Sequence, residues 1–142
     1  MFCVGHGDGY ITFAKQGPVL IARLCLDASS RDIVVAFKIA QKRGWLSPEH
    51  SLLVDLRRFI GSVDWACIRE LRALAPWIDK PSNRNCCAYL LEAGDMRNYL
   101  ISVVSALYPA VHHRSFTQET AAWDWLADQA ASDEPSSCRR RA

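Results

Sequence analysis

The sequence lacks long hydrophobic runs and the usual marks of export. No apolar stretch approaches the ~18–20 residues that a membrane-spanning helix needs. The first residues, MFCVGHGDGY, contain neither the basic region nor the apolar region of a secretory signal peptide. We therefore expect a cytoplasmic protein with no membrane span.

Charge of one sign is also scarce. The 17 Lys and Arg residues are nearly balanced by 15 Asp and Glu residues, which leaves a net charge of +2. Three arginines, Arg139 to Arg141, stand together near the end, so the rest of the chain has no basic surplus. Because nucleic-acid-binding surfaces need such a surplus, we expect protein or small-molecule partners instead.

Common catalytic and metal-binding motifs are missing. Cys-x-x-Cys, His-Glu-x-x-His and Gly-x-Ser-x-Gly do not occur, and the six cysteines have no export context, so we interpret them as reduced thiols. The adjacent pairs Cys86-Cys87 and His112-His113 fall in strand-like segments, where neighbouring side chains point to opposite faces and cannot chelate one ion. The sequence therefore predicts a protein that is not an enzyme and has neither a metal site nor a cofactor.

Hydrophobic periods are present from Gly9 onward. Two short apolar runs joined by Gln16-Gly17-Pro18 predict an antiparallel hairpin, after which helical and strand periods alternate. The later strands are expected at residues 51–56, 86–91 and 111–116. This pattern predicts an α/β fold of order β-β-α-β-α-β-α-β-α. Its sheet is mixed, mostly parallel and five-stranded, with an antiparallel opening strand and about four helices.

The two ends of the chain show no such period. In residues 1–8 the glycine pattern lacks the preceding strand and the following helix of a phosphate-binding loop, so we expect a flexible arm. Residues 132–142 read as a disordered tail. The expected organisation is therefore one domain over residues 9–131.

Three features carry a family resemblance. They are the opening hairpin, the strand Leu52-Leu53-Val54-Asp55-Leu56-Arg57 leading into a helix, and the closing pattern Phe116-Thr117-(x)4-Ala122-Trp123-x-Trp125-Leu126. Together they resemble the STAS domain family, the anti-sigma-factor-antagonist fold, and especially its small stand-alone bacterial proteins. The resemblance covers about residues 9–130. It implies a regulatory, protein-binding domain.

The resemblance also implies a modification site. In the antagonist branch, a serine in the loop after this strand is phosphorylated, and counting without gaps from Asp55 places Ser62 near that position. A phosphate there would meet a helix start and the guanidiniums of Arg57 and Arg58. The alternative is that the Ser62 hydroxyl only caps the helix.

Asp55 is a second candidate. It closes a central strand, where open α/β sheets bind their ligands, although its carboxylate is equally suited to binding loop amides.

Tryptophans supply the candidate interaction residues Trp65, Trp77 and Trp123. Trp123 and Trp125 stand two apart on a predicted helix and cannot both face the sheet, so we expect Trp123 to point outward. An exposed Trp is suited to anchoring a protein or a lipid. The alternative is that each Trp lies flat over the edge of the core.

Two functional hypotheses follow. The first is a non-catalytic STAS-like regulatory module that binds a protein partner or a second copy of itself through its second helix and the loop before it. Phosphorylation in that loop would regulate this binding. The alternative is a small-ligand or lipid carrier of CRAL-TRIO-like architecture, which requires a contiguous apolar pocket between a helix and the sheet.

Overall fold

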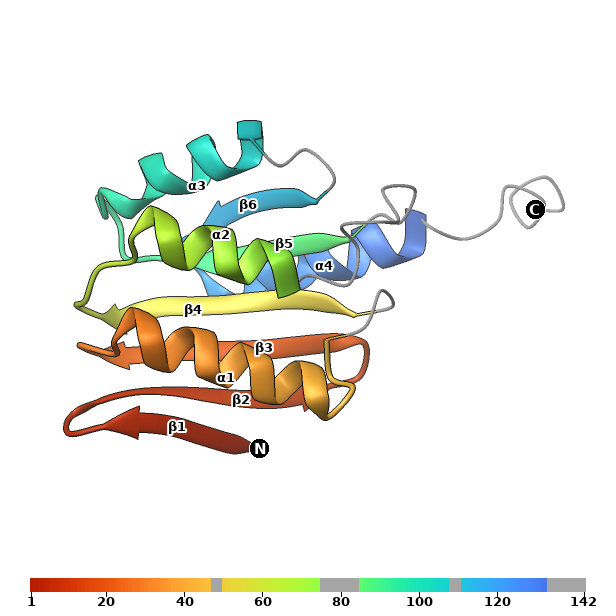
Figure 1. Ribbon diagram of the computed structural model, residues 1–142. Helices are drawn as coiled ribbons and strands as arrows, with labels where there is room; N and C mark the ends of the chain where they lie inside the picture. The colour runs from red at the N-terminus through yellow and green to blue at the C-terminus, as the bar shows by residue number, and fades with distance from the viewer. Residues whose placement is uncertain (47–49, 75–84, 108–110, 133–142) are drawn as a thin grey trace, which may run out of the picture.

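The computed structural model describes residues 1–46, 50–74, 85–107 and 111–132. Within these ranges the chain forms one sheet and four helices (Figure 1). Their order is β1 (Phe2–His6), β2 (Gly9–Gln16), β3 (Val19–Leu26), α1 (Ser30–Lys42), β4 (Ser51–Phe59), α2 (Trp65–Leu74), β5 (Cys86–Leu90), α3 (Arg97–Leu107), β6 (His112–Phe116) and α4 (Glu119–Ser132). Trp77 and residues 133–142 lie outside the described part of the chain.

The strands lie side by side in chain order, from β1 to β6. β1, β2 and β3 pair antiparallel, whereas β3 to β6 pair parallel. Parallel crossovers share one hand, so successive crossovers that step in the same direction place their helices on the same face. Figure 1 shows α1, α2 and α3 on one face and α4 on the other. The predicted mixed α/β sheet is confirmed, with six strands in place of five in the described residues.

The additional strand is β1, so the expectation of a flexible arm over residues 1–8 is wrong. Gly7 has a φ of +64° in the tight turn between His6 and Gly9, which are paired. Gly9 packs so closely on the residues after β3 that a Cβ atom would lie 2.5 Å from the backbone nitrogen of Ala28. The glycines therefore allow a tight turn and close packing, which glycine permits at low steric cost.

Aromatic contacts hold β1 at the sheet edge. The Phe2 ring lies 5.2 Å from that of Phe13 and 5.3 Å from that of Trp45 between centroids, and the Arg43 guanidinium sits 4.6 Å from the Phe2 centroid. At the other end of β1, His6 Nδ1 lies 3.0 Å from Asp32 Oδ1. β1 thus contacts both the sheet and α1 through its side chains.

Two cores lie on the two faces of the sheet. The larger core packs the sheet against α1, α2 and α3, and the smaller core packs it against α4. Leu52, Val54 and Leu56 of β4 belong to the larger core, whereas Leu53 belongs to the smaller one. None of the helices in the described ranges combines the length and apolar character required to cross a membrane.

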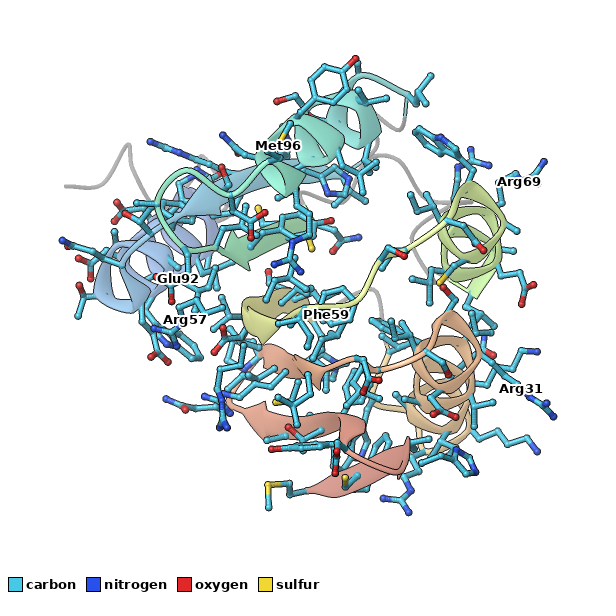
Figure 2. All side chains as sticks on the ribbon, turned by 90° about the vertical axis from the view of Figure 1, so that its left-hand side faces the viewer. Arg31, Arg57, Phe59, Arg69, Glu92 and Met96 are labelled. Carbon is cyan, nitrogen blue, oxygen red and sulfur yellow. The ribbon has the colours of Figure 1, made fainter. Side chains whose placement is uncertain are left out.

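A register shift in β4 decides which face its last residues occupy. Arg23 pairs with Asp55, but Cys25 pairs with Arg58, so β4 contains one extra residue. Such a bulge interrupts the alternation of side chains. Phe59 accordingly joins the larger core, and Figure 2 shows Arg57 on the α4 side of the sheet with Phe59 turned away from it.

Candidate functional site

A cavity of about 590 Å³ lies between the sheet and the helices of its α1–α3 face. α1 lies over β1 and β2, α3 lies against β6, and α2 packs mainly against α1. This arrangement leaves space above the central strands β4 and β5. Apolar side chains dominate the lining: Leu24, Ile33, Phe37, Leu46, Leu52, Val54, Leu56, Phe59, Val63, Ile68, Leu71, Leu100, Ile101, Val104 and Val111.

Arg97 is a charged side chain in this lining. Its guanidinium lies 5.1 Å from the centroid of the Phe59 ring, a cation–π contact. Nη2 donates to Asp95 Oδ2 at 2.7 Å, and Nε donates to the same carboxylate at 3.1 Å. The Arg97 side-chain hydrogen bonds lower the pKa of Asp95, so this carboxylate stays ionised near neutral pH.

His113 and Tyr89 form a second polar group in the lining. The Tyr89 hydroxyl lies 2.9 Å from His113 Nδ1, and the two rings stack at 5.8 Å between centroids. Burial, with a smaller contribution from His112, lowers the pKa of His113 to about 4. Burial also raises the pKa of Tyr89. Both side chains are therefore neutral at physiological pH.

Two cavity-lining residues have buried polar atoms that no protein atom satisfies. They are Arg97 Nη1 and His113 Nε2, two of four such side-chain atoms in the described part of the chain. Buried polar groups in native proteins nearly always have a hydrogen-bond partner, from the protein, a water or a ligand. The cavity thus combines an apolar wall with two lining residues that each carry a buried polar atom without a protein partner.

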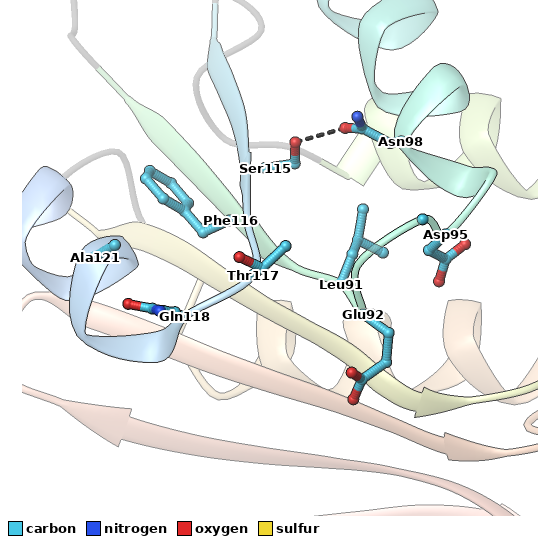
Figure 3. A pocket seen from close by; sticks show the side chains of 10 residues that line it. Leu91, Glu92, Asp95, Asn98, Ser115, Phe116, Thr117, Gln118 and Ala121 are labelled. Carbon is cyan, nitrogen blue, oxygen red and sulfur yellow. Dashed lines mark hydrogen bonds between the residues drawn. The ribbon is translucent and has the colours of Figure 1, made fainter.

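A second hollow, of about 400 Å³, lies at the carboxyl edge of the sheet between the loops that follow β5 and β6 (Figure 3). Several of its polar groups bond to protein groups. Ser115 Oγ lies 2.5 Å from Asn98 Oδ1, and Asp95 is held by Arg97. The lining of this hollow is about equally polar and apolar, whereas that of the cavity is mostly apolar.

Asp55 does not face the cavity. On the α4 side of the sheet, its carboxylate accepts hydrogen bonds from Arg57 Nη2 at 2.8 Å, from Arg57 Nε at 3.0 Å and from the Arg57 backbone N–H at 3.1 Å. Glu119 Oε2 lies 3.3 Å from Arg57 Nη2, and Arg23 Nε lies 3.7 Å from Asp55. Burial favours a raised pKa for Asp55, but the hydrogen bonds and charge of Arg57 outweigh it and lower the pKa. These four side chains form a closed ion-pair network.

Ser62 is exposed, lines the cavity and lies just before α2, which begins at Trp65. The cap of α2 is Asp64, whose Oδ1 accepts the backbone N–H of Cys67 at 2.8 Å, so the expectation that Ser62 caps the helix is wrong. Arg57, with its guanidinium bonded to Asp55 and Glu119, lies on the α4 side of the sheet (Figure 2). Arg58 is exposed at the end of β4.

The structure describes two of the three candidate tryptophans, Trp65 and Trp123, and they differ in exposure. Trp65 is 46% exposed at the start of α2. Trp123 is half-buried and packs, like Trp125, against the smaller core, so the expectation that it points outward is wrong. Ala122 and Leu126 form the buried line of α4, and the two Trp positions flank that line by roughly 80° on either side. Wide rings at such positions reach down to the sheet from both sides.

Sequence reasoning overlooked Arg97 and Tyr89, and it weighed His113 only as half of a histidine pair. A strand period indicates that Tyr89 and His113 share a face with their alternate neighbours. The two side chains meet because β5 and β6 pair with Cys87 opposite His113. Tyr89 lies two residues after Cys87 and so points to the same face. Within the described ranges, no three His, Cys, Asp or Glu side chains come together in a way that would hold a metal ion.

Comparisons with known proteins identify the fold. No protein-family model matches the chain, and no curated protein is detectably similar in sequence. A solved structure that is similar belongs to an uncharacterised protein of the DUF3478 family with a SpoIIAA-like fold, from Shewanella loihica PV-4. The two chains are 16% identical, with a TM-score of 0.59, over 82% of this chain and 91% of the other. The chain therefore has a SpoIIAA-like fold, in agreement with the STAS resemblance.

Proposed function

We propose that this chain is a ligand-binding module that holds a small apolar or amphipathic molecule between β4, β5, α2 and α3. The apolar cavity carries the proposal. Its volume of about 590 Å³ lies within the ~300–1,000 Å³ typical of small-molecule sites, and its lining is mostly apolar with a few polar groups, as in such sites. The pocket between a helix and the sheet is also what the carrier hypothesis requires.

Native mass spectrometry and probe binding test this proposal. We expect the gently ionised protein to carry a co-purified small molecule, and the protein after solvent extraction to bind an apolar fluorescent probe. Val104→Trp fills the cavity from α3 and should abolish both signals. Tyr99→Trp adds the same ring to the same helix at a position that is 77% exposed, and should leave both intact. An empty protein that binds no probe would refute the proposal.

A second candidate function is protein binding through the loop before α2, as in the STAS-like regulatory hypothesis. Two large apolar side chains flank Ser62 in this region, with Ile60 76% exposed and Trp65 46% exposed. Exposed apolar side chains grouped around one loop, here just after β4 and at the start of α2, favour a protein partner or a second copy of the chain. Phosphorylation of the exposed Ser62 would add a dianion beside them and would so alter binding.

Phosphopeptide mapping of residues 55–64 from native cells tests the switch, and the solution mass tests self-association. We expect a phosphate on Ser62 that is absent from the Ser62→Ala variant. We also expect an assembly that Trp65→Ala weakens. Ser62 that is unmodified under all growth conditions would refute the phosphorylation switch. A protein that is strictly monomeric and captures no partner would refute the protein-binding function.

A further inference from the structure

We propose that the bound molecule is an amphiphile with a carboxylate head group, which Arg97 and His113 bind, and an apolar tail, which the rest of the cavity holds. This inference rests on the proposed function and specifies its ligand. It starts from the two buried polar atoms of the cavity lining that have no protein partner, Arg97 Nη1 and His113 Nε2.

Arg97 is held in place before any ligand binds. Asp95 accepts from Nε and Nη2, and the Phe59 ring lies against the guanidinium. Only Nη1 is left without a protein acceptor. A donor fixed in this way loses little side-chain entropy when a ligand oxygen arrives, and hydrogen bonds from guanidinium to carboxylate are stronger than those between neutral groups.

His113 supplies the second hydrogen-bonding atom. Its ring is held by the Tyr89 hydroxyl at Nδ1 and by stacking on the Tyr89 ring. When the Tyr89 hydroxyl donates to Nδ1, the proton of the neutral imidazole resides on Nε2, which then becomes a donor. A carboxylate oxygen accepts from such a donor, whereas an alkylammonium head group has no acceptor to offer.

The charges of the lining favour an anion. Arg97 lines the cavity, and no Asp or Glu is among its described lining residues. Asp95 balances the charge of Arg97 from outside the lining but does not occupy Nη1. Both an alkylammonium head group and a neutral one would therefore be bound less well than a carboxylate of the same tail.

A series of probes with one tail isolates the head group. The full-length protein, after solvent extraction, is titrated calorimetrically with decanoate, 1-decanol and decyltrimethylammonium, each below its micelle concentration. We expect decanoate to bind at least tenfold more tightly than decanol, because hydrogen bonds to charged groups are worth about one to two orders of magnitude in affinity. Decyltrimethylammonium should bind most weakly.

Two variants assign the head group to its residues. Arg97→Gln and His113→Phe should each weaken decanoate binding by about tenfold while leaving decanol binding within about twofold. His113→Phe retains the aromatic stacking on Tyr89, so it separates lost hydrogen bonding from lost packing. Arg114→Gln is the matched control, because it removes a charge from the neighbouring exposed position of β6 and lies outside the cavity lining.

The possible outcomes separate this inference from the proposed function. Equal affinities for the three probes, or preference for the ammonium, would overturn the carboxylate assignment while the cavity remains a binding site, with water on the two polar atoms. Decanoate binding that is unaffected by both variants would overturn the roles of Arg97 and His113. Binding of no probe would overturn the proposed function together with this inference.

Discussion

Asp55 and Arg57 are two residues apart on β4 and point to the same face of the sheet, as alternate strand residues do. Their two-point contact, completed by Glu119 at the start of α4, joins the sheet to the helix on that face. The hydrogen bonds with Asp55 raise the pKa of Arg57, so both groups stay charged across the physiological range. The pair thus orients α4 on the sheet, and Asp55 is unsuited to bind an external ligand.

His113 gives the molecule a defined response to acid. Burial lowers its folded-state pKa to about 4, whereas an unfolded histidine titrates near 6.5. The neutral form therefore contributes stability that is fully present above pH ~6.5 and is lost as the pH falls through about 4. We expect this one group to reduce the free energy of unfolding by roughly 2–3 kcal/mol over that window.

Urea unfolding at neutral pH and near pH 4 measures this loss. His113→Phe should show a smaller decrease between the two pH values than the parent protein, because a phenyl ring does not titrate. His112→Gln should retain most of the decrease, since His112 is the lesser of the two causes that depress the pKa. A decrease of the same size in the parent and in His113→Phe would contradict this account.

Single residues were the hardest scale to predict from the sequence. The sequence offered Ser62 as a possible cap of α2, whereas the cap is Asp64, because several side chains before that helix are able to accept from its free N–H groups. Arg97 lies at the start of α3, and His113 lies near the start of β6. No local sequence pattern distinguishes a residue that faces a cavity from one that faces a filled core. That difference depends on how the helices pack over the sheet.

At the scale of elements, periodicity predicted the helices and most strands but missed β1. The strand is short, and its sequence includes Gly5, so it has few side chains from which a period can be read. Its stability comes from contacts distant in sequence, between Phe2, Phe13 and Trp45. Such contacts are invisible to a local pattern, which explains why residues 1–8 read as an arm.

Phe2→Ala tests whether β1 contributes to stability. Phe2 is half-buried, stacks on Phe13 and lies beneath Arg43, so we expect truncation to lower the free energy of unfolding by about 1–2 kcal/mol. Hydrogen exchange should show faster exchange of the β1 and β2 amides that pair the two strands. Met96→Ala, at a position that is 89% exposed and outside β1, should change neither measurement. Wild-type stability in Phe2→Ala would mean that β1 is not bound to the sheet in solution.

At the scale of the whole molecule, the sequence predicted the architecture and the structure added the cavity. Strands that follow one another in spatial order place three crossover helices on one face, while α4 is the one helix of the described residues on the other. α1 and α3 cover the strands towards the two edges of the sheet, and α2 spans the centre by packing on α1. The hydrophobic periods of α2 and β4 look the same whether or not side chains fill the space between them, so the sequence left both functional hypotheses open.

A cavity of this kind makes the stability of the whole domain depend on its occupant. An unfilled apolar space forfeits contacts that a ligand restores, and a ligand that binds only the folded state stabilises it by mass action. At a concentration one hundred times its dissociation constant, decanoate should add about 2.7 kcal/mol, which corresponds to a rise in Tm of roughly 10 °C for a domain of this size. Differential scanning calorimetry of the extracted protein measures that rise. Val104→Trp should show none, because its indole ring takes the place of the ligand, and Tyr99→Trp should show the full rise. An equal increase in all three proteins would mean that decanoate stabilises the fold from outside the cavity.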